Sequence, residues 1–246
     1  MTRRSLGQHY LVDPEVVQRM VSSARLEGNE AVLEIGTGKG ILTEKLAGLC
    51  PRLECYEVDP ENHRATLARL GGKSALVHLA DAFQERPQFD VLVSSLPYSR
   101  SRDFIEWISQ VEYRKAVVLL QEDFVKKVLS SPGSRNYRAV SAIAQISSEL
   151  RVLKRISRSA FSPQPKVTSV LVVIRPKVRL SHRQVLEIKR LFSLRRREVV
   201  SALSLLGLAG GGQDYGRRRV YSLAPGEVYE ICTSLKRKRG IYVPSS

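Results

Sequence analysis

A glycine-rich turn directly after a short apolar run is the most restrictive feature of this 246-residue sequence. Residues 31–35 read Ala-Val-Leu-Glu-Ile and lead into Gly36-Thr37-Gly38-Lys39-Gly40, and an apolar stretch follows over residues 41–49. This order predicts a strand, a close backbone approach to a ligand, and a helix. In a dinucleotide-binding fingerprint the third glycine comes one residue later, so the turn by itself is weak evidence for any particular ligand.

Short apolar runs and amphipathic stretches alternate along most of the chain. We expect further strands at residues 53–59, 75–79, 89–94, 116–120 and 170–174, and helices at residues 14–24 and 60–70. The alternation predicts an α/β fold with a doubly wound, mainly parallel, Rossmann-like sheet. In such sheets, ligands bind outside the carboxyl ends of the strands.

The pattern changes after Pro176. Two helical stretches follow, residues 181–206 and 225–235, and a glycine-rich segment separates them. We therefore expect two domains, an α/β domain over residues 1–176 and a small, basic helical domain over residues 177–246.

Positive charge is concentrated in the second of these regions. The chain has 40 Lys and Arg against 24 Asp and Glu, a net charge of +16, and residues 175–246 hold 16 of the basic and 5 of the acidic residues. A basic surface favours a polyanion such as nucleic acid, although general solubility is an alternative explanation. The candidate phosphate contacts form three clusters: Arg195, Arg196 and Arg197; Arg217, Arg218 and Arg219; and Lys236, Arg237, Lys238 and Arg239.

Apolar runs and cysteines limit the class of protein. No run of about 18 apolar residues is present, so we expect no membrane span. Cys50, Cys55 and Cys232 are too dispersed for a metal site or a disulfide framework. We therefore expect a cytoplasmic protein with reduced thiols and no metal, and nothing in the sequence indicates an obligate oligomer, so a monomer is expected.

Two carboxylates follow the glycine turn at the ends of the next two predicted strands. Glu57 comes about 20 residues after the turn, where a carboxylate can accept hydrogen bonds from both ribose hydroxyls of a nucleoside. Asp81 ends the third strand, where it can accept from an adenine amino group. Taken singly, each acid is equally well explained as a solvated strand end. The three features in this order favour S-adenosylmethionine over a dinucleotide as the cofactor.

The segment Ser95-Leu96-Pro97-Tyr98 resembles the Asn-Leu-Pro-Tyr motif of the small-subunit rRNA adenine N6-dimethyltransferase family. The macrolide-resistance enzymes, which act on large-subunit rRNA, share much of the pattern and remain an alternative. Further resemblances to family motifs follow in the family's order at residues 7–11, 121–128, 136–141, 160–169 and 192–197. They extend over nearly the whole chain, and the arginine-rich second region favours the small-subunit group.

The resemblance implies a cofactor-binding methyltransferase domain, a small helical domain, and N6-dimethylation of two adjacent adenosines in small-subunit rRNA, either as RNA or in a pre-ribosomal particle. It makes Ser95, Leu96, Pro97 and Tyr98 the expected catalytic segment. The expected cofactor contacts are His9, Leu11, Gly36, Glu57, Asp81 and Ser95, with Thr37 and Gly38 beside the methionine part and the neighbours Val58 and Ala82.

Ser95 stands where the family has Asn. An exocyclic adenine amine is a poor nucleophile, and acceptors that hold its N–H groups help to direct its lone pair toward the methyl donor. A serine hydroxyl also accepts a hydrogen bond, but on a shorter side chain. Three outcomes stay open: full activity, weak activity that stops at the monomethyl product, or an inactive RNA-binding assembly factor that keeps the fold.

A stacked adenosine must be flipped out to reach a methyl donor, so aromatic residues near the motif are of interest. Tyr98 is expected to stack on the flipped base, and Phe161 is the candidate for the opposite wall, although a core position explains Phe161 equally well. Arg100, where relatives usually have Ile, is expected to lie in solvent or to contact an RNA phosphate.

Overall fold

The computed structural model describes residues 9–208 and 215–234, and its internal contacts divide the chain into two compact units. Unit 1 is Met1–Val125 with Ser148–Arg179, and unit 2 is Lys126–Ser147 with Leu180–Ser246. The break at Arg179 lies close to the expected boundary at residue 176. Residues 126–147, which the sequence placed in the first domain, group instead with unit 2, because the helix in this segment packs on helices of the C-terminal region.

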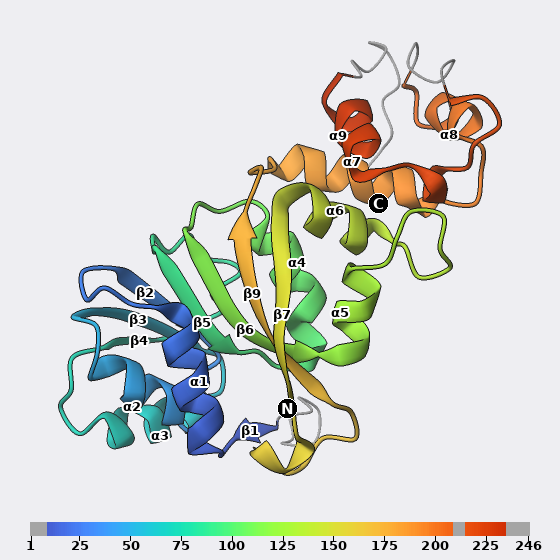
Figure 1. Ribbon diagram of the computed structural model, residues 1–246. Coiled ribbons are helices and arrows are strands. Elements are labelled where there is room, and N and C mark those ends of the chain that lie inside the picture. Colours follow the sequence, from blue (N-terminus) through green and yellow to red (C-terminus); the bar gives the residue numbers. More distant parts are fainter. Residues whose placement is uncertain (1–8, 209–214, 235–246) are drawn as a thin grey trace. The chain divides into compact units, whose positions relative to one another are not determined.

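Unit 1 is built on a seven-stranded sheet with the order β4-β3-β2-β5-β6-β9-β7 (Figure 1). Its strands are β2 (Ala31–Ile35), β3 (Arg52–Glu57), β4 (Leu76–Leu79), β5 (Val91–Ser95), β6 (Lys115–Gln121), β7 (Ser148–Ile156) and β9 (Ser169–Pro176). Strands β2 to β6 pair in parallel, whereas β9 is antiparallel to both β6 and β7. The predicted α/β fold with a mainly parallel sheet is confirmed.

Helices connect the strands of unit 1, and some of them begin at a residue whose side chain caps the first turn. They are α1 (Pro14–Ala24), α2 (Ile41–Ala47), α3 (Pro60–Leu70), α4 (Ser101–Ile108) and α5 (Glu122–Val128). Asp13 and Asp59 cap α1 and α3 by accepting hydrogen bonds from backbone N–H groups in the first turn, and each is followed by proline. Proline is favoured there because its fixed φ suits a helix and its missing N–H would have no intrahelical partner.

Hydrophobic packing of α1 and α2 against the sheet forms a large core cluster in unit 1. The inward face of α1 contributes Val17, Met20 and Ala24, and α2 contributes Leu42 and Leu46, all of them buried. These side chains pack with alternate residues of the strands, including Val32, Cys55, Val93, Val117 and Leu171. The intervening strand residues Leu33, Leu92 and Val118 are also fully buried, as expected for a parallel sheet covered on both faces.

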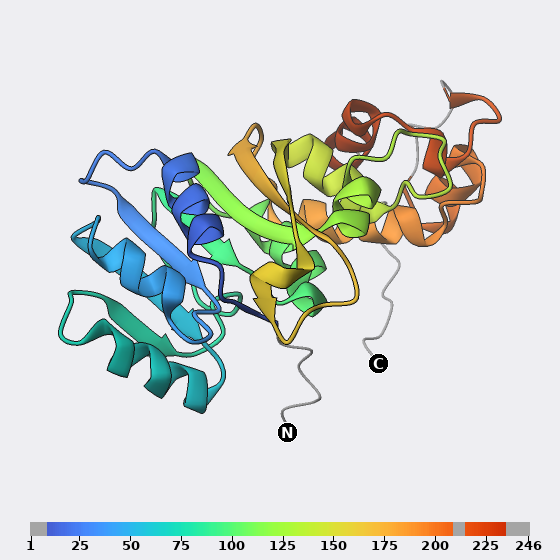
Figure 2. The same ribbon diagram turned by 60° about the horizontal axis from the view of Figure 1, so that its bottom comes forward.

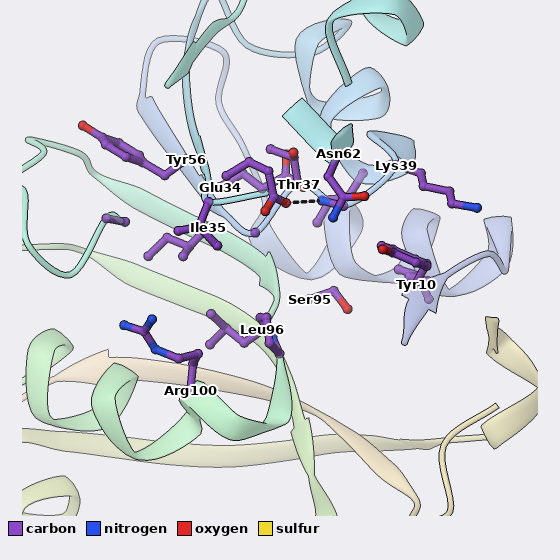
Figure 3. A pocket seen from close by; sticks show the side chains of 18 of the residues that line it. Tyr10, Glu34, Ile35, Thr37, Lys39, Tyr56, Asn62, Ser95, Leu96 and Arg100 are labelled. Atoms are coloured by element: carbon purple, nitrogen blue, oxygen red, sulfur yellow. Dashed lines mark hydrogen bonds between the residues drawn. The ribbon is translucent and has the colours of Figure 1, made fainter. Parts of the chain in front are cut away.

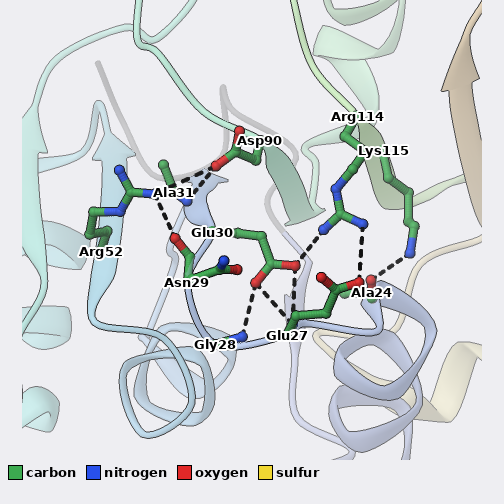
Figure 4. Close-up of polar contacts among 10 residues, drawn as sticks. All are labelled: Ala24, Glu27, Gly28, Asn29, Glu30, Ala31, Arg52, Asp90, Arg114 and Lys115. Carbon is green, nitrogen blue, oxygen red and sulfur yellow. Dashed lines mark hydrogen bonds and ion pairs between the residues drawn. The ribbon is translucent and has the colours of Figure 1, made fainter.

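A polar network joins the loop before β2 to the start of β6 (Figure 4). Glu30 is only 5 % exposed, and its carboxylate accepts hydrogen bonds from the backbone N–H groups of Glu27 at 2.9 Å and Gly28 at 3.0 Å. It also forms an ion pair with Arg114, and the adjacent Lys115 donates from Nζ to the carbonyl oxygen of Ala24 at 2.6 Å. These contacts fix the amino-terminal edge of the sheet, opposite the edge that carries the glycine turn.

A separate two-stranded sheet brings the start of the described chain beside a late segment. Strand β1 (Tyr10–Leu11) pairs antiparallel with β8 (Phe161–Ser162), so Leu11 lies opposite Phe161. Figure 2 shows the blue β1 segment leading toward the yellow segment that contains β8. This pairing holds His9, Tyr10 and Leu11 next to the carboxyl edge of the main sheet.

Unit 2 is helical, as predicted for its C-terminal part. Its helices are α6 (Ala139–Ser147), α7 (His182–Ser193), α8 (Val199–Leu205) and α9 (Pro225–Ser234). Helices α6, α7 and α9 pack against one another, and the buried ring of Tyr137 meets Phe192 edge-on with centroids 5.4 Å apart. Ser181 and Gln184 form a capping box at the start of α7.

The structure differs from the expected elements in several places. The single helical stretch expected over residues 181–206 is two helices, because the chain turns after Leu194 and Glu198 forms a β-bridge with Arg219. Strand β7 was missed because most of its side chains are exposed, so it has no apolar run. Helices α4 and α6 were also missed. In the described residues, no helix has the length and apolar character needed to cross a membrane.

Candidate functional site

A pocket lies at the carboxyl ends of β2 and β5, where the strand order changes direction (Figure 3). Strands β3 and β4 lie on one side of β2, and β5 and β6 lie on the other side. Its walls come from β1, the turn after β2 and the ends of β3, β4 and β5. Open α/β sheets place their ligands at such switch points because adjacent connections leave on opposite faces.

The glycine turn forms the floor of this pocket. Gly36 has φ of +75° and Gly38 has φ of +55°, which are left-handed values that favour glycine. A Cβ on Gly38 would lie 3.1 Å from Cδ1 of Tyr10, so a side chain there is also sterically disfavoured. The turn therefore presents bare backbone to whatever occupies the pocket.

Glu57 holds the turn in place from the end of β3. Its Oε2 accepts a hydrogen bond from the N–H of Gly38 at 2.8 Å, and its Oε1 accepts from the N–H of Asp59 at 2.9 Å. The side chain is buried, and this burial raises the pKa of the Glu57 carboxyl above its usual value. Each oxygen has a second lone pair, so the carboxylate retains acceptor capacity for ligand hydroxyls.

Asp81 already has a cationic partner in the pocket. Arg100 Nη2 lies 3.0 Å from Oδ2 of Asp81, and Nε of Arg100 lies 3.0 Å from Oδ2 of Asp103. The guanidinium also lies over the ring of Phe83, 4.7 Å from its centroid. The expectation that Arg100 simply lies in solvent is wrong, because its guanidinium pairs with two carboxylates and packs on an aromatic ring. Its contact with an RNA phosphate stays a prediction.

Two buried polar residues line the pocket beside the turn. Asn62 on α3 is 6 % exposed, and its Nδ2 has no hydrogen-bond partner among the described residues. Glu34 in β2 is 1 % exposed, and burial raises the pKa of its carboxyl to about 8. An unpartnered buried donor is costly, so Asn62 is a position where a polar ligand atom would be stabilising.

The motif Ser95-Leu96-Pro97-Tyr98 begins at the last residue of β5. Ser95, Leu96 and Pro97 line the pocket, and Ser95 lies between Leu96 and Tyr10 in Figure 3. The Ser95 hydroxyl makes no hydrogen bond to another described residue. Tyr98 starts the short 3₁₀ helix Tyr98–Arg100, and its hydroxyl shares a hydrogen bond with Oγ of Ser169 at 2.5 Å.

The structure brings together all ten residues expected to contact the cofactor. These pocket-lining residues are His9, Leu11, Gly36, Thr37, Gly38, Glu57, Val58, Asp81, Ala82 and Ser95. His9 is additionally held by a hydrogen bond from its ring Nδ1 to the carbonyl oxygen of Pro163 at 2.7 Å, and its ring lies 5.7 Å from that of Tyr98.

Phe161 is the member of the expected catalytic set that packs elsewhere. It is 3 % exposed and belongs to the hydrophobic core, where a base cannot stack on it. Tyr98 does not line the pocket but stands next to it through His9. The sequence also missed Tyr10, Lys39, Asn62 and Phe83, which line the pocket. Asn62 had a detectable signal, because it lies in the first turn of a helix that begins directly after Glu57 and Asp59.

The basic clusters of unit 2 fall into different environments. Arg195, Arg196 and Arg219 line a second pocket, whereas Arg197 and Arg217 are exposed outside it. Arg218 donates to both carboxylate oxygens of Glu227, at 2.6 and 2.8 Å, so it is held by an internal ion pair, and its expected phosphate contact stays a prediction. Lys236, Arg237, Lys238 and Arg239 lie outside the described residues.

Several known proteins are similar to this chain in sequence and in fold. The family model for ribosomal RNA adenine dimethylase matches residues 1–211. A probable ribosomal RNA small subunit methyltransferase A of Thermococcus gammatolerans is 33 % identical over 93 % of this chain and 87 % of its own length. The ribosomal RNA small subunit methyltransferase A of Thermotoga neapolitana is 32 % identical over 96 % of this chain and 92 % of its own.

Two solved structures have the same fold. The dimethyladenosine transferase of Plasmodium falciparum superposes with a TM-score of 0.75 and 22 % identity, over 91 % of this chain and 96 % of its own. The 23S rRNA methyltransferase ErmE superposes with a TM-score of 0.64 and 21 % identity, over 92 % and 99 % of the two chains. The predicted family, class I methyltransferase fold and enzyme class are confirmed: the chain belongs to the ribosomal RNA adenine dimethylase family.

Proposed function

We propose that this enzyme uses S-adenosylmethionine to dimethylate N6 of adjacent adenosines in small-subunit rRNA. The observation that carries the proposal is the pocket of unit 1. Its lining contains the glycine turn, the Glu57 carboxylate and the Asn62 amide, whose Nδ2 has no partner among the described residues, and Ser95 lines the same pocket. The family match and the similarity to ribosomal RNA small subunit methyltransferases support the choice of substrate.

The residues of the pocket fit an adenosine-containing cofactor. Glu57 retains an acceptor lone pair on each oxygen for ribose hydroxyls, and Asn62 Nδ2 is a buried donor that requires an acceptor. Asp81 accepts one hydrogen bond from the N–H of Phe83 at 3.0 Å and pairs with Arg100, and it can still accept from an adenine amino group. When bound, S-adenosylmethionine would supply an activated methyl group on its sulfonium.

The reaction requires that the protein hold the target amine in line with the methyl donor. The adenine N6 lone pair would form the new bond to the methyl carbon as the bond between that carbon and sulfur breaks. S-adenosylhomocysteine would be the leaving group, and the proton that N6 loses would pass to solvent. Ser95 Oγ is an acceptor without a partner among the described residues, and it can hold one N–H of the amine. Fixing the amine in this way contributes through orientation and electrostatics rather than through strong acid–base chemistry.

Tyr98 is the proposed stacking platform for the flipped base. Its ring is braced on two sides, by the hydrogen bond to Ser169 and by the His9 ring. Bracing lowers the entropy that is lost when a base stacks on the ring, because the side chain is already fixed. A half-buried ring beside the pocket therefore suits a flipped adenosine better than the core residue Phe161 does.

The assignment of separate functions to the two units is also a proposal. We assign cofactor binding to unit 1 and rRNA binding to the basic helical unit 2, and we expect a cytoplasmic monomer that acts during ribosome biogenesis. The net charge of +16 would draw the protein to rRNA and make binding strongly dependent on salt.

The test is methyl transfer from labelled S-adenosylmethionine to unmethylated small-subunit particles and to naked small-subunit rRNA, with nucleoside analysis by mass spectrometry. The native chain, Ser95→Ala and Ser95→Asn are compared, and binding of S-adenosylhomocysteine serves as the control for folding. We expect N6-dimethyladenosine from the native chain and a rate about 10- to 100-fold lower for Ser95→Ala.

Two results would contradict the proposal. Equal rates for the native chain and Ser95→Ala would remove Ser95 from the mechanism. Activity in Ser95→Asn with none in the native chain would show that the native protein is an RNA-binding assembly factor.

A further inference from the structure

Lys39 is a cation that lines the pocket of unit 1 without a carboxylate partner. Among the residues that the structure describes, its ammonium forms no ion pair and no hydrogen bond. Arg100 is the other lysine or arginine in the lining, and it pairs with the carboxylates of Asp81 and Asp103. The charge of Lys39 is therefore available to a ligand, whereas that of Arg100 is already neutralised.

The backbone of Lys39 is fixed on both sides by the glycine turn. Before it, the N–H of Gly38 donates to Oε2 of Glu57 at 2.8 Å. After it, the N–H of Gly40 donates to the carbonyl oxygen of Thr37 at 2.9 Å, which closes the turn. The Lys39 side chain therefore leaves the backbone from a defined place beside the pocket, and only its own torsion angles are free.

The ammonium of Lys39 lies over the ring of Tyr10, 5.1 Å from the ring centroid. Tyr10 belongs to β1 and lines the same pocket, and its ring packs closely on the turn at Gly38. An aromatic face attracts a cation electrostatically and leaves the N–H groups of a lysine able to donate to oxygen acceptors. The ring thus holds the ammonium beside the pocket and leaves it able to bind an anionic group.

Lys39 and Arg100 lie on opposite sides of the pocket (Figure 3). In the proposed binding mode, Asp81 beside Arg100 receives the adenine amino group, and Glu57 receives the ribose hydroxyls. Adenine and sulfur are attached to opposite ends of the ribose, so the methionine part must extend away from Asp81. The charged end of the cofactor therefore points to the side of the pocket where Lys39 lies.

We propose that the ammonium of Lys39 binds the carboxylate of the methionine part of S-adenosylmethionine, and that Tyr10 holds the ammonium in place for this contact. The inference rests on the proposed function for the identity of the cofactor. A carboxylate that leaves water requires charged or N–H donors, and in the described part of the chain Lys39 supplies an unpaired cation on that side. The carboxylate does not change during methyl transfer, so the contact contributes to affinity rather than to the chemical step.

The experiment measures affinity for S-adenosylmethionine and for its decarboxylated form, which lacks only the carboxylate, by calorimetry in the absence of RNA. Lys39→Gln is compared with Lys45→Gln as the matched control. Lys45 is an exposed lysine of α2 that has the same charge and does not line the pocket. Thermal unfolding of each variant checks folding.

We expect the native chain to bind S-adenosylmethionine about 3- to 10-fold more tightly than the decarboxylated form, as for a charged contact at a partly exposed site. Lys39→Gln should lose this preference through weaker binding of S-adenosylmethionine alone, whereas Lys45→Gln should keep it. Lys39→Arg keeps the charge and should recover most of the preference. Lys39→Glu should reverse it, because its carboxylate repels that of the cofactor.

Two further measurements separate binding from a structural role. In steady-state methyl transfer, Lys39→Gln should raise KM for S-adenosylmethionine more than it lowers kcat. Tyr10→Phe keeps the aromatic face and should keep the preference for the carboxylate, whereas Tyr10→Leu removes the face and should reduce that preference.

Equal weakening of both ligands by Lys39→Gln would overturn the proposal, because Lys39 would then shape the turn rather than bind the carboxylate. A preference that persists in Lys39→Gln would also overturn it and would assign the carboxylate to backbone N–H groups of the turn. A native chain that shows the preference but transfers no methyl group to rRNA would refute the proposed function while supporting this inference.

Discussion

Arg100 Nη2 lies 3.0 Å from Oδ2 of Asp81, inside the pocket where Asp81 was expected to meet an adenine amino group. The carboxylate is therefore oriented before any ligand arrives, by Arg100, which donates to both oxygens, and by the N–H of Phe83, which donates to Oδ1. We interpret Arg100 as a positioning residue, because it would act on the cofactor through Asp81 rather than on RNA.

Replacing Arg100 is predicted to reduce discrimination for the adenine amino group. Arg100→Ala should weaken binding of S-adenosylhomocysteine by about 3- to 10-fold, because Asp81 loses a charged hydrogen bond at a partly exposed site. Binding of the inosine analogue, which lacks the amino group, should change less when measured by calorimetry. Arg102→Ala, at an exposed position on α4, is the control. Equal effects on both ligands would reduce the role of Arg100 to packing.

The hydroxyl of Tyr98 and its ring should contribute separately to RNA methylation. Tyr98→Phe keeps the ring and removes only the hydrogen bond to Ser169, so kcat/KM for RNA should fall by about 2- to 10-fold. Tyr98→Ala removes the stacking surface, and a fall of about 10- to 100-fold is expected. Steady-state methyl transfer measures both values. If Tyr98→Ala retained the activity of Tyr98→Phe, the base would not stack on this ring.

Alanine at Gly38 is predicted to damage the cofactor pocket. The residue has φ of +55°, and a Cβ would lie 3.1 Å from Cδ1 of Tyr10. The left-handed conformation alone costs a non-glycine residue about 1–2 kcal/mol, so both cofactor affinity and the melting temperature should fall. Gly48→Ala is the control, because Gly48 has an ordinary helical φ of −81° and its Cβ would have room. Calorimetry and thermal unfolding would show whether the two substitutions differ.

Glu34 should make stability decrease as pH rises. Its carboxyl keeps its proton in the folded protein up to a pKa of about 8 because it is buried, whereas the unfolded chain ionises near 4.5. Between these pH values the folded state binds the extra proton, so the free energy of unfolding falls as pH increases from about 4.5 to about 8. Glu34→Gln cannot ionise at this position. Its free energy of unfolding should therefore fall by a few kcal/mol less than that of the native chain over this pH interval. Parallel profiles in urea unfolding would show that Glu34 does not titrate there.

The network at the amino-terminal edge of the sheet should be important for stability but not for methyl transfer. Glu30→Ala leaves Arg114 and two backbone N–H groups without their shared carboxylate (Figure 4), and a loss of about 2–4 kcal/mol is expected. Glu27→Ala is the control, since the Glu27 side chain is 75 % exposed and 3.9 Å from Arg114. Urea unfolding measures the difference. A similar loss in both variants would indicate that the shared carboxylate is not the stabilising group.

Local sequence was sufficient for the elements that surround the cofactor pocket. Asp13-Pro14 and Asp59-Pro60 define helix starts, and the glycines at 36 and 38 define a left-handed turn, because each signal depends on residues within one or two turns of chain. Given parallel strands, the ends of β3, β4 and β5 must meet at one edge of the sheet. Glu57, Asp81 and Ser95 therefore could be placed together before the fold was known.

Tertiary structure decided what those residues contact. Whether Arg100 faced solvent, RNA or Asp81, and whether Phe161 faced a base or the core, depended on packing between segments far apart in the sequence. The pocket that joins Arg135 to Arg195 and Arg219 likewise depends on backbone hydrogen bonds from Gly133 to Tyr221 and from Tyr221 to Arg195, which no periodicity records. The sequence by itself determined the α/β fold, the family and the edge of the sheet that binds the cofactor, because these follow from local conformational preference and strand order. Only the tertiary structure decided the partners of the charged side chains, because a guanidinium pairs with whichever carboxylate the folded chain places beside it.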